Sequence, residues 1–403
     1  MLSNLMELPG LTPVPGGELD ARRARLAAAL EAAGLDGVLI ATGANLYWLT
    51  GLALDGYLHV GADGSAVWMV KRGMARAERE SEFSGKRTGV RSLKQVPSLC
   101  GTGAGRIGLE LDTLPVSVHD RMKEAFGADA EFVDASEVLR ETRSTKSAFE
   151  LDCMRKAAAI SATTFEAIPE LLAPGRREIE VAADIERGLR ARGHPMLFPV
   201  HRWGHRFSPL YLCSGPSATL PGTFMGPLGG TGLSGVDPQG CGRRPIERDE
   251  PIIIDMCCGE RGYLSDQTVT FVIGTLPDDM MQAHALSLAI RDEVAAMLRP
   301  GVHRTAPWER AHEMAQAAGL AERFMGLGDD RLSFVGHGLG IEIDEQPVLA
   351  PRQRGELAAD MVIAVEPKFF FEKRGAVGVE DTFLVTTAGG ERLTRGPDQV
   401  VAL

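Results

Sequence analysis

The feature that most constrains the fold is a set of four apolar segments in the C-terminal part of the chain, each carrying acidic or imidazole side chains. The segments are PIIIDMCCGERGYLSDQTVTFVIG (251–274), FVGHGLGIEIDEQP (334–347), MVIAVEPKFFF (361–371) and GAVGVEDTFLV (375–385). Their candidate polar residues are Asp255, Asp266, His337, Glu366 and Glu380. Carboxylates on buried strands need cations or raised pKa values to compensate their charge. The fold therefore has to bring these side chains to a place where that compensation is available.

A pair of divalent metal ions is one way to compensate such a cluster. Two ions about 3.5 Å apart, bridged by carboxylates, would neutralise the acidic charge and would share a hydroxide nucleophile at neutral pH. Oxygen-rich ligation with one imidazole suits Mn²⁺, Co²⁺ or Zn²⁺. Each residue taken singly is explained at least as well by an ordinary hydrogen-bonded role. The metal hypothesis therefore depends on the five residues together.

Local sequence predicts how two of these segments place their side chains. Asp255 and Asp266 lie on two strands that we expect to be joined by the turn GERGYLS, which would bring both carboxylates to one point. His337 lies between Gly336 and Gly338, an arrangement that would let the backbone approach a ligand closely.

Composition excludes several functional classes for this chain of 403 residues. Lys and Arg number 43 against 54 Asp and Glu, a net charge of −11, and without a basic patch we expect no nucleic-acid partner. The N-terminus lacks the basic and apolar regions of a signal peptide, and no apolar stretch is long enough to span a bilayer, so we expect no membrane association. The six cysteines show no C-x-x-C pair, and we expect reduced thiols and a cytoplasmic location.

The length predicts two domains, and the pattern of the chain changes between them. Short strands and helices alternate in the first part, with a helix expected over 19–34 and a hairpin over 58–70. Longer helices follow. The first of them is expected to begin near Ser147, where Glu150 three residues later completes a capping box.

The ordered residues and their local motifs resemble metallopeptidase family M24, which includes methionine aminopeptidase, aminopeptidase P, prolidase and creatinase. The motifs are D-x₁₀-D (255–266), GHGLG (336–340), VEP (365–367) and VED (379–381). Two earlier segments agree with this resemblance. They are NLYWLTG (45–51), which is similar to a turn of the creatinase-type N-terminal domain, and RSTKSAFELDCMRKAA (143–158), which is similar to the linker and first helix of the catalytic domain.

The resemblance implies an α/β (α+β) fold with two domains. A creatinase-type N-terminal mixed α/β domain is expected over residues 1–145, and a pita-bread catalytic domain over residues 146–403. The two-domain layout also implies a homodimer, with the partner's N-terminal domain lining the mouth of the active site.

The resemblance further implies a role for each of the five residues. Asp255 and Asp266 would hold one metal ion, His337 and Glu366 would complete the second, and Asp266 and Glu380 would bridge the two. Glu366 would also move the proton of the bridging water. The implied activity is that of an Xaa-Pro peptidase, in which a metal-bridged hydroxide attacks a peptide or amide C–N bond of a small substrate.

Three positions depart from the prolidase and aminopeptidase P pattern. Asp344 and Gly222 stand where those enzymes carry two substrate-side histidines, and Gly378 stands where they often carry an arginine. Removing a donor to a developing oxyanion typically costs about 10²–10³ in rate. A non-peptidase reaction on a small zwitterionic metabolite is therefore an open alternative.

Other polar residues are candidates for the work of the missing histidines. His201, His205 and Arg206 in FPVHRWGHRF are candidates for binding the substrate, and an ordinary polar loop is the alternative. Asp344 is a candidate catalytic residue that would accept a hydrogen bond from a cationic substrate nitrogen, and a turn-capping role is its alternative. The glycine-rich loop 226–242 is either a lid or an inert insertion. A non-catalytic binding protein is a minor alternative for the whole chain. Relatives that only bind partners have typically lost metal ligands, whereas all five candidate ligands are present here.

Overall fold

The computed structural model describes residues 11–100, 105–128, 130–201 and 207–403, and the chain divides into two compact units. The first is Met1–Arg143 and the second is Ser144–Leu403. Each unit has its own sheet structure and its own buried apolar cluster. The domain boundary expected between residues 145 and 146 stays a prediction, because a compact unit need not be one that folds alone.

The first unit is built on one mixed sheet of six strands in the order β4-β3-β2-β1-β5-β6. β1 pairs antiparallel with β2 and parallel with β5, and the expected hairpin forms between β2 and β3. The elements are α1 (Gly16–Ala32), β1 (Gly37–Ile40), α2 (Gly43–Thr50), β2 (Gly56–Gly61), β3 (Ala66–Val70), α3 (Met74–Glu80), β4 (Lys86–Gly89), α4 (Val96–Cys100), β5 (Arg106–Leu109), α5 (Val116–Phe126), β6 (Glu131–Asp134) and α6 (Ser136–Ser144).

The segment expected to be a turn in this unit is a helix. Most of NLYWLTG lies in α2, which ends at Thr50 and is followed by Gly51 as its C-cap, with a left-handed φ of 77°. The carboxylate of Glu110 accepts hydrogen bonds from the backbone N–H groups of Ala41 (2.8 Å) and Thr42 (3.0 Å) at the start of this helix. The carboxylate satisfies donors near the start of the helix, which favours a helix where the sequence motif suggested a turn.

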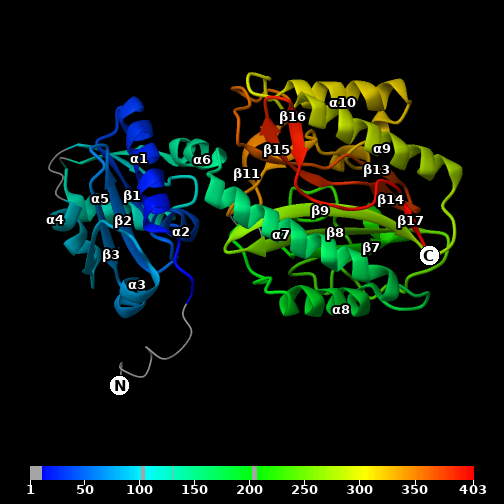
Figure 1. Cartoon of the computed structure of the whole chain (residues 1–403), viewed down its shortest axis with the longest axis horizontal. Coiled ribbons are helices and arrows are strands. Elements are labelled where there is room, and N and C mark those ends of the chain that lie inside the picture. Colours follow the sequence, from blue (N-terminus) through cyan, green and yellow to red (C-terminus); the bar gives the residue numbers. More distant parts are fainter. Residues whose placement is uncertain (1–10, 101–104, 129, 202–206) are drawn as a thin grey trace. The chain divides into compact units, whose positions relative to one another are not determined.

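The second unit contains three sheets, and Figure 1 shows the long helices α7 and α8 beside the sheet that carries β7, β8 and β9. The strand orders are β17-β9-β8-β7, β11-β10-β12-β15-β16 and β13-β14. The elements are α7 (Ala148–Ala167), α8 (Glu178–Ala191), β7 (Leu210–Ser214), β8 (Pro251–Glu260), β9 (Tyr263–Val272), α9 (Asp278–Met297), α10 (Ala306–Ala317), β10 (Gly336–Gly338), β11 (Glu345–Leu349), β12 (Val362–Val365), β13 (Lys368–Phe371), β14 (Gly375–Gly378), β15 (Asp381–Thr386), β16 (Gly389–Arg392) and β17 (Val401–Ala402).

The predicted capping box at the start of α7 is confirmed. The hydroxyl of Ser147 accepts the N–H of Glu150 at 3.2 Å, and the carboxylate of Glu150 accepts the N–H of Ser147 at 2.8 Å. Reciprocal bonds of this kind satisfy two donors that a helix would otherwise leave unpaired at its N-terminus.

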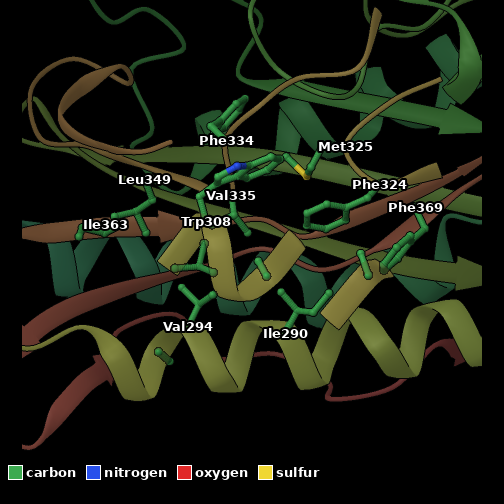
Figure 2. Close-up of a cluster of buried hydrophobic side chains, with 14 of the residues drawn as sticks. Ile290, Val294, Trp308, Phe324, Met325, Phe334, Val335, Leu349, Ile363 and Phe369 are labelled. Atoms are coloured by element: carbon green, nitrogen blue, oxygen red, sulfur yellow. The ribbon is translucent and has the colours of Figure 1, made fainter. Parts of the chain in front are cut away.

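A large apolar cluster supports the strands that carry the candidate site. Figure 2 shows Ile290 and Val294 of α9 and Trp308 of α10 packed with Val335 and Phe369. Val335 precedes β10, and Phe369 lies on β13. Because side chains alternate across a strand, burying Phe369 in this cluster turns its neighbour in sequence, Lys368, to the opposite face.

Candidate metal centre

Two neighbouring strands bring Asp255 and Asp266 to the same face of their sheet. In the antiparallel register of β8 and β9, Asp255 lies opposite Thr268 and Cys257 lies opposite Asp266. The two aspartates are therefore diagonal neighbours on one face. The expected seven-residue turn is shorter in the structure, because the strands continue to Glu260 and from Tyr263. The strand pair therefore places both carboxylates on one face, and the expectation that they meet at one point stays a prediction.

His337 has one ring nitrogen bound to the protein and the other turned toward carboxylates. Nδ1 is 3.1 Å from the carbonyl oxygen of Gly338, which can only accept, so Nδ1 carries the proton. Nε2 lies 3.5 Å from Oε1 of Glu366 and 3.9 Å from Oε1 of Glu380. A neutral imidazole with its proton held on the far nitrogen is the form that ligates metals.

The glycines beside His337 serve strand packing, and the expectation that they let the backbone approach a ligand stays a prediction. A Cβ on Gly336 would lie 2.4 Å from the carbonyl oxygen of Ala364 in β12. A Cβ on Gly338 would lie 2.2 Å from the carbonyl oxygen of Gln346 in β11. Only glycine lets both neighbouring strands come this close to β10.

Glu366 and Glu380 are held by backbone contacts between separate strands. The N–H of Glu366, directly after β12, donates to the carbonyl oxygen of Val335 at 2.9 Å. Glu380 lies between β14 and β15 and exchanges backbone hydrogen bonds with Thr268 of β9, at 3.1 and 3.2 Å. The hydroxyl of Thr268 also donates to Oε2 of Glu380 at 2.9 Å. These contacts attach both glutamates to the frame that carries the aspartates.

The side chains converge on one small volume. Ligand atoms of Asp266, His337 and Glu380 all lie within 4.8 Å of one another, a spacing that suits a single metal ion. Glu366 and Glu380 are only 3% and 1% exposed. The structure thus groups four carboxylates and one imidazole, as the sequence pattern predicts, although their roles as ligands stay a prediction.

Burial and mutual repulsion act on the acids of this cluster. Removal from water, followed by the charge of Glu380, raises the pKa of Asp255 to about 8. The same two causes raise the pKa of Asp266 well above its usual range and also raise that of Glu366. Raised pKa values are expected where carboxylates crowd without enough positive charge, and a divalent cation would reverse them.

One residue of the centre was missed by sequence reasoning. Lys368, with 0% of its side chain exposed, places Nζ 2.8 Å from Oε2 of Glu366, 2.7 Å from Oε2 of Glu380 and 3.6 Å from Oδ2 of Asp255. Burial alone lowers the pKa of Lys368, but the charges of the three acids raise it well above its usual range. Its sequence signal was a single lysine between Pro367 and three phenylalanines, an unusual place for a charge unless it is paired.

Lys368 lies opposite a departure noted in the sequence. It pairs across β13 and β14 with Gly378, the position where related enzymes often carry an arginine. A Cβ on Gly378 would lie 2.7 Å from both Cα and Cγ of Lys368. The absence of a side chain at Gly378 therefore leaves the space that the aliphatic part of Lys368 fills. The positive charge that an arginine would bring on β14 is brought instead by Lys368 on β13.

The substrate-side candidates are only partly accounted for. Oδ1 of Asp344 accepts the backbone N–H of His201 at 2.8 Å, and Nδ1 of His201 lies 4.0 Å from Oε1 of Glu342. The structure therefore joins two of the predicted residues by a backbone contact. His205 and Arg206 lie outside the described residues.

The loop after Asp344 is anchored by a buried ion pair. Nζ of Lys146 lies 2.8 Å from Oε2 of Glu345, and both side chains are at most 4% exposed. Oε1 of Glu345 also accepts the N–H groups of Ile341 (2.9 Å) and Glu342 (3.2 Å). This network ties the chain that follows His337 to Lys146, directly before α7.

The second departure, Gly222, lies in the glycine-rich stretch. It lines a cavity of about 430 Å³ together with Phe224, Leu327 and Phe370. A Cβ at this position would lie 3.1 Å from Cα of Gly229. The role of the 226–242 loop stays a prediction.

No helix in the described part of the chain is long and apolar enough to cross a membrane. All six cysteines are buried and are free thiols.

Comparisons with known proteins agree with this geometry. Residues 152–387 match the sequence profile of metallopeptidase family M24, and residues 22–145 match that of the creatinase/prolidase N-terminal domain. The probable dipeptidase PepE of Mycobacterium tuberculosis is 28% identical over 402 residues, which cover 96% of this chain and 97% of the relative. The Xaa-Pro dipeptidase of Pyrococcus furiosus is 27% identical over 367 residues, covering 90% and 94%.

A solved structure shows the same architecture. The crystal structure of dipeptidase PepE from Mycobacterium ulcerans has a TM-score of 0.80 and 26% identity, and the match covers 97% of this chain and 99% of that one. The expected fold, a creatinase-type N-terminal domain followed by a pita-bread catalytic domain, is thereby confirmed.

Proposed function

The chain belongs to metallopeptidase family M24, and from this premise we propose that it is a metal-dependent hydrolase of the Xaa-Pro peptidase type, acting on dipeptides. The observation that carries the proposal is the convergence of Asp266, His337 and Glu380 within 4.8 Å, with Nδ1 of His337 bonded to the carbonyl oxygen of Gly338 and Nε2 turned toward the carboxylates. The names of the relatives, probable dipeptidase and Xaa-Pro dipeptidase, support the substrate class.

The donor set fits a divalent cation of the Mn²⁺, Co²⁺ or Zn²⁺ type. Asp266, His337 and Glu380 would hold it, and when bound it would act as a Lewis acid and lower the pKa of a coordinated water. The chain's own residues prepare this place. Gly338 orients the imidazole, and Thr268 holds Glu380 through a backbone pair and a hydroxyl bond.

Glu366 is the proposed proton acceptor for the attacking water. Its Oε1 faces Nε2 of His337 at 3.5 Å, while its Oε2 accepts a hydrogen bond from Lys368. The carboxyl group is therefore held with one oxygen directed toward the place where the ion would lie. The sequence predicts two ions, and Lys368 lies on the side of Asp255, where one of them would be held.

A second candidate reaction is favoured by the two positions that lack the expected histidines. Asp344, at the position expected for a histidine, already accepts the N–H of His201, and Gly222 carries no side chain at the other position. Hydrolysis of an amide in a small zwitterionic metabolite is thus the alternative to dipeptide cleavage.

We also propose that the chain forms a homodimer, for which light scattering would give about twice the mass of one chain. We further propose a cytoplasmic location, which the six free thiols support.

The test is hydrolysis of a panel of Xaa-Pro dipeptides, other dipeptides and small amides, followed by mass spectrometry. The protein is stripped with a chelator, reloaded with Mn²⁺ and compared with the Glu366→Gln variant. Glu372→Gln, at a highly exposed residue after β13, is the matched control. We expect cleavage of at least one substrate that requires the metal and is lost in Glu366→Gln only.

A folded, metal-loaded protein that cleaves no member of the panel would contradict the proposal and would favour a non-catalytic binding protein. Cleavage restricted to non-peptide amides would replace dipeptides with the alternative substrate class.

A further inference from the structure

In both glutamates of the centre, Glu366 and Glu380, one carboxylate oxygen faces His337 and the other faces Lys368. Oε1 of Glu366 and Oε1 of Glu380 face Nε2 of His337, at 3.5 and 3.9 Å. Oε2 of both residues faces Nζ of Lys368, at 2.8 and 2.7 Å. The imidazole side has room for an ion among acceptors, whereas the lysine side already holds a donor.

The lysine side is the one on which Asp255 lies. Its Oδ2 is 3.6 Å from Nζ of Lys368, so the ammonium is surrounded by oxygens of three acids. A divalent ion bound by Asp255 and Glu380 would have to lie about 2.0–2.2 Å from their oxygens. Nζ of Lys368 already lies 2.7 Å from Oε2 of Glu380 and 3.6 Å from Oδ2 of Asp255, so it competes for the oxygens that such an ion would need, and the two cations would also repel each other.

The backbone fixes the lysine in this place. Lys368 pairs with Gly378 across β13 and β14, and its carbonyl oxygen accepts the N–H of Met325 at 3.0 Å. Its stem packs against the bare backbone of Gly378, whose N–H and carbonyl both bond to the hydroxyl of Thr270. With 0% of the side chain exposed and Phe369 buried in the apolar cluster on the other face, the strand has no solvent side to which the ammonium can turn.

We infer that Lys368 takes the place of one of the two metal ions, so that the centre binds a single divalent ion between Asp266, His337 and Glu380. The ammonium supplies a fixed positive charge to Asp255, Glu366 and Glu380, where a second ion would otherwise be needed. This inference rests on the proposed function, since it concerns the same centre, and it changes the expected cofactor from two ions to one.

The test is the number of Mn²⁺ ions bound per folded chain. The full chain is stripped, equilibrated with excess Mn²⁺, dialysed and analysed for metal by mass spectrometry, and its bound Mn²⁺ is examined by electron paramagnetic resonance. We expect one ion per chain, with the spectrum of an isolated ion. The Lys368→Ala variant removes the ammonium and should bind two ions with the spectrum of a coupled pair.

Lys146→Ala is the matched control, because it removes another buried, ion-paired lysine of the same unit, at Glu345. It should keep one ion per folded chain. Two ions in the wild-type protein would overturn the inference and leave the metal-dependent function standing, and no ion at all would overturn both. If Lys368→Ala folds and still binds one ion, Lys368 is not what excludes the second. If that variant does not fold, the wild-type count decides alone.

Discussion

His337 shows how much a single side chain can determine at this centre. Its Nδ1 is bound by the carbonyl of Gly338, so only Nε2 is free to ligate. We expect His337→Ala to lower the affinity for Mn²⁺ by at least about 100-fold, since even residues that only orient metal ligands cost 10–100-fold when replaced. Titration calorimetry measures this loss. His303→Ala, at an exposed histidine, should bind Mn²⁺ as the wild type does. Equal affinities in the two variants would contradict the assignment of His337.

The residues of the centre could be predicted from the sequence only in part. The acids and His337 stand out because each interrupts an apolar strand pattern, which is a local signal. Lys368 follows Glu366 by two residues, a spacing that would suit a solvated pair. Its real partners include Asp255 and Glu380, which lie 113 and 12 residues away along the chain and reach it only through strand pairing. No linear pattern contains that arrangement.

At the scale of elements, a buried imidazole links the end of α8 to β8. Nδ1 of His194 accepts the N–H of Gly259 at 2.8 Å, and burial, with a contribution from Arg190, lowers the pKa of His194 to about 4. The unfolded chain, with a histidine pKa near 6.5, therefore takes up the proton first as pH falls. Stability is present above pH 6.5 and is lost between pH 6.5 and 4.

We expect this histidine to account for on the order of 1 to 2 kcal/mol of the unfolding free energy lost between pH 6.5 and 5. His194→Gln keeps an acceptor for Gly259 and should flatten the fall of the melting temperature over this range. His284, whose pKa burial also lowers to about 4, should leave part of the slope in place. His303→Gln should keep the full slope, and an unchanged slope in His194→Gln would refute the assignment.

Elements whose signals are local agreed best with sequence expectations. Ser147 and Glu150 formed the predicted capping box because both partners lie within one helical turn. The polar letters of GERGYLS predicted a long turn, yet Tyr263, Leu264 and Ser265 are buried strand residues. Arg261 and Gly262, with φ of 50° and 81°, make the turn alone. These three residues extend the strand because distant parts of the chain bury them, and the local sequence does not indicate that burial.

At the scale of the whole molecule, the centre belongs to the second unit alone. Asp255, Asp266, His337, Glu366 and Glu380 all lie in Ser144–Leu403, on or directly beside strands of separate sheets. The alternation of helices and strands predicted a mixed α/β chain of two parts. The sheet order and the crossing of β9 with the β14–β15 segment could not be predicted from periodicity, because they depend on pairings between segments about 110 residues apart. Resemblance to family M24 supplied that part of the fold.

The central claim, that this buried cluster is a metal centre, is tested most directly by an anomalous difference map from crystals of the full chain soaked in Mn²⁺. We predict one peak at full occupancy bounded by Asp266, His337 and Glu380, with Nζ of Lys368 in ordinary density between Asp255 and the two glutamates. A map with no peak at the cluster, from crystals in which the five side chains are ordered, would contradict the account.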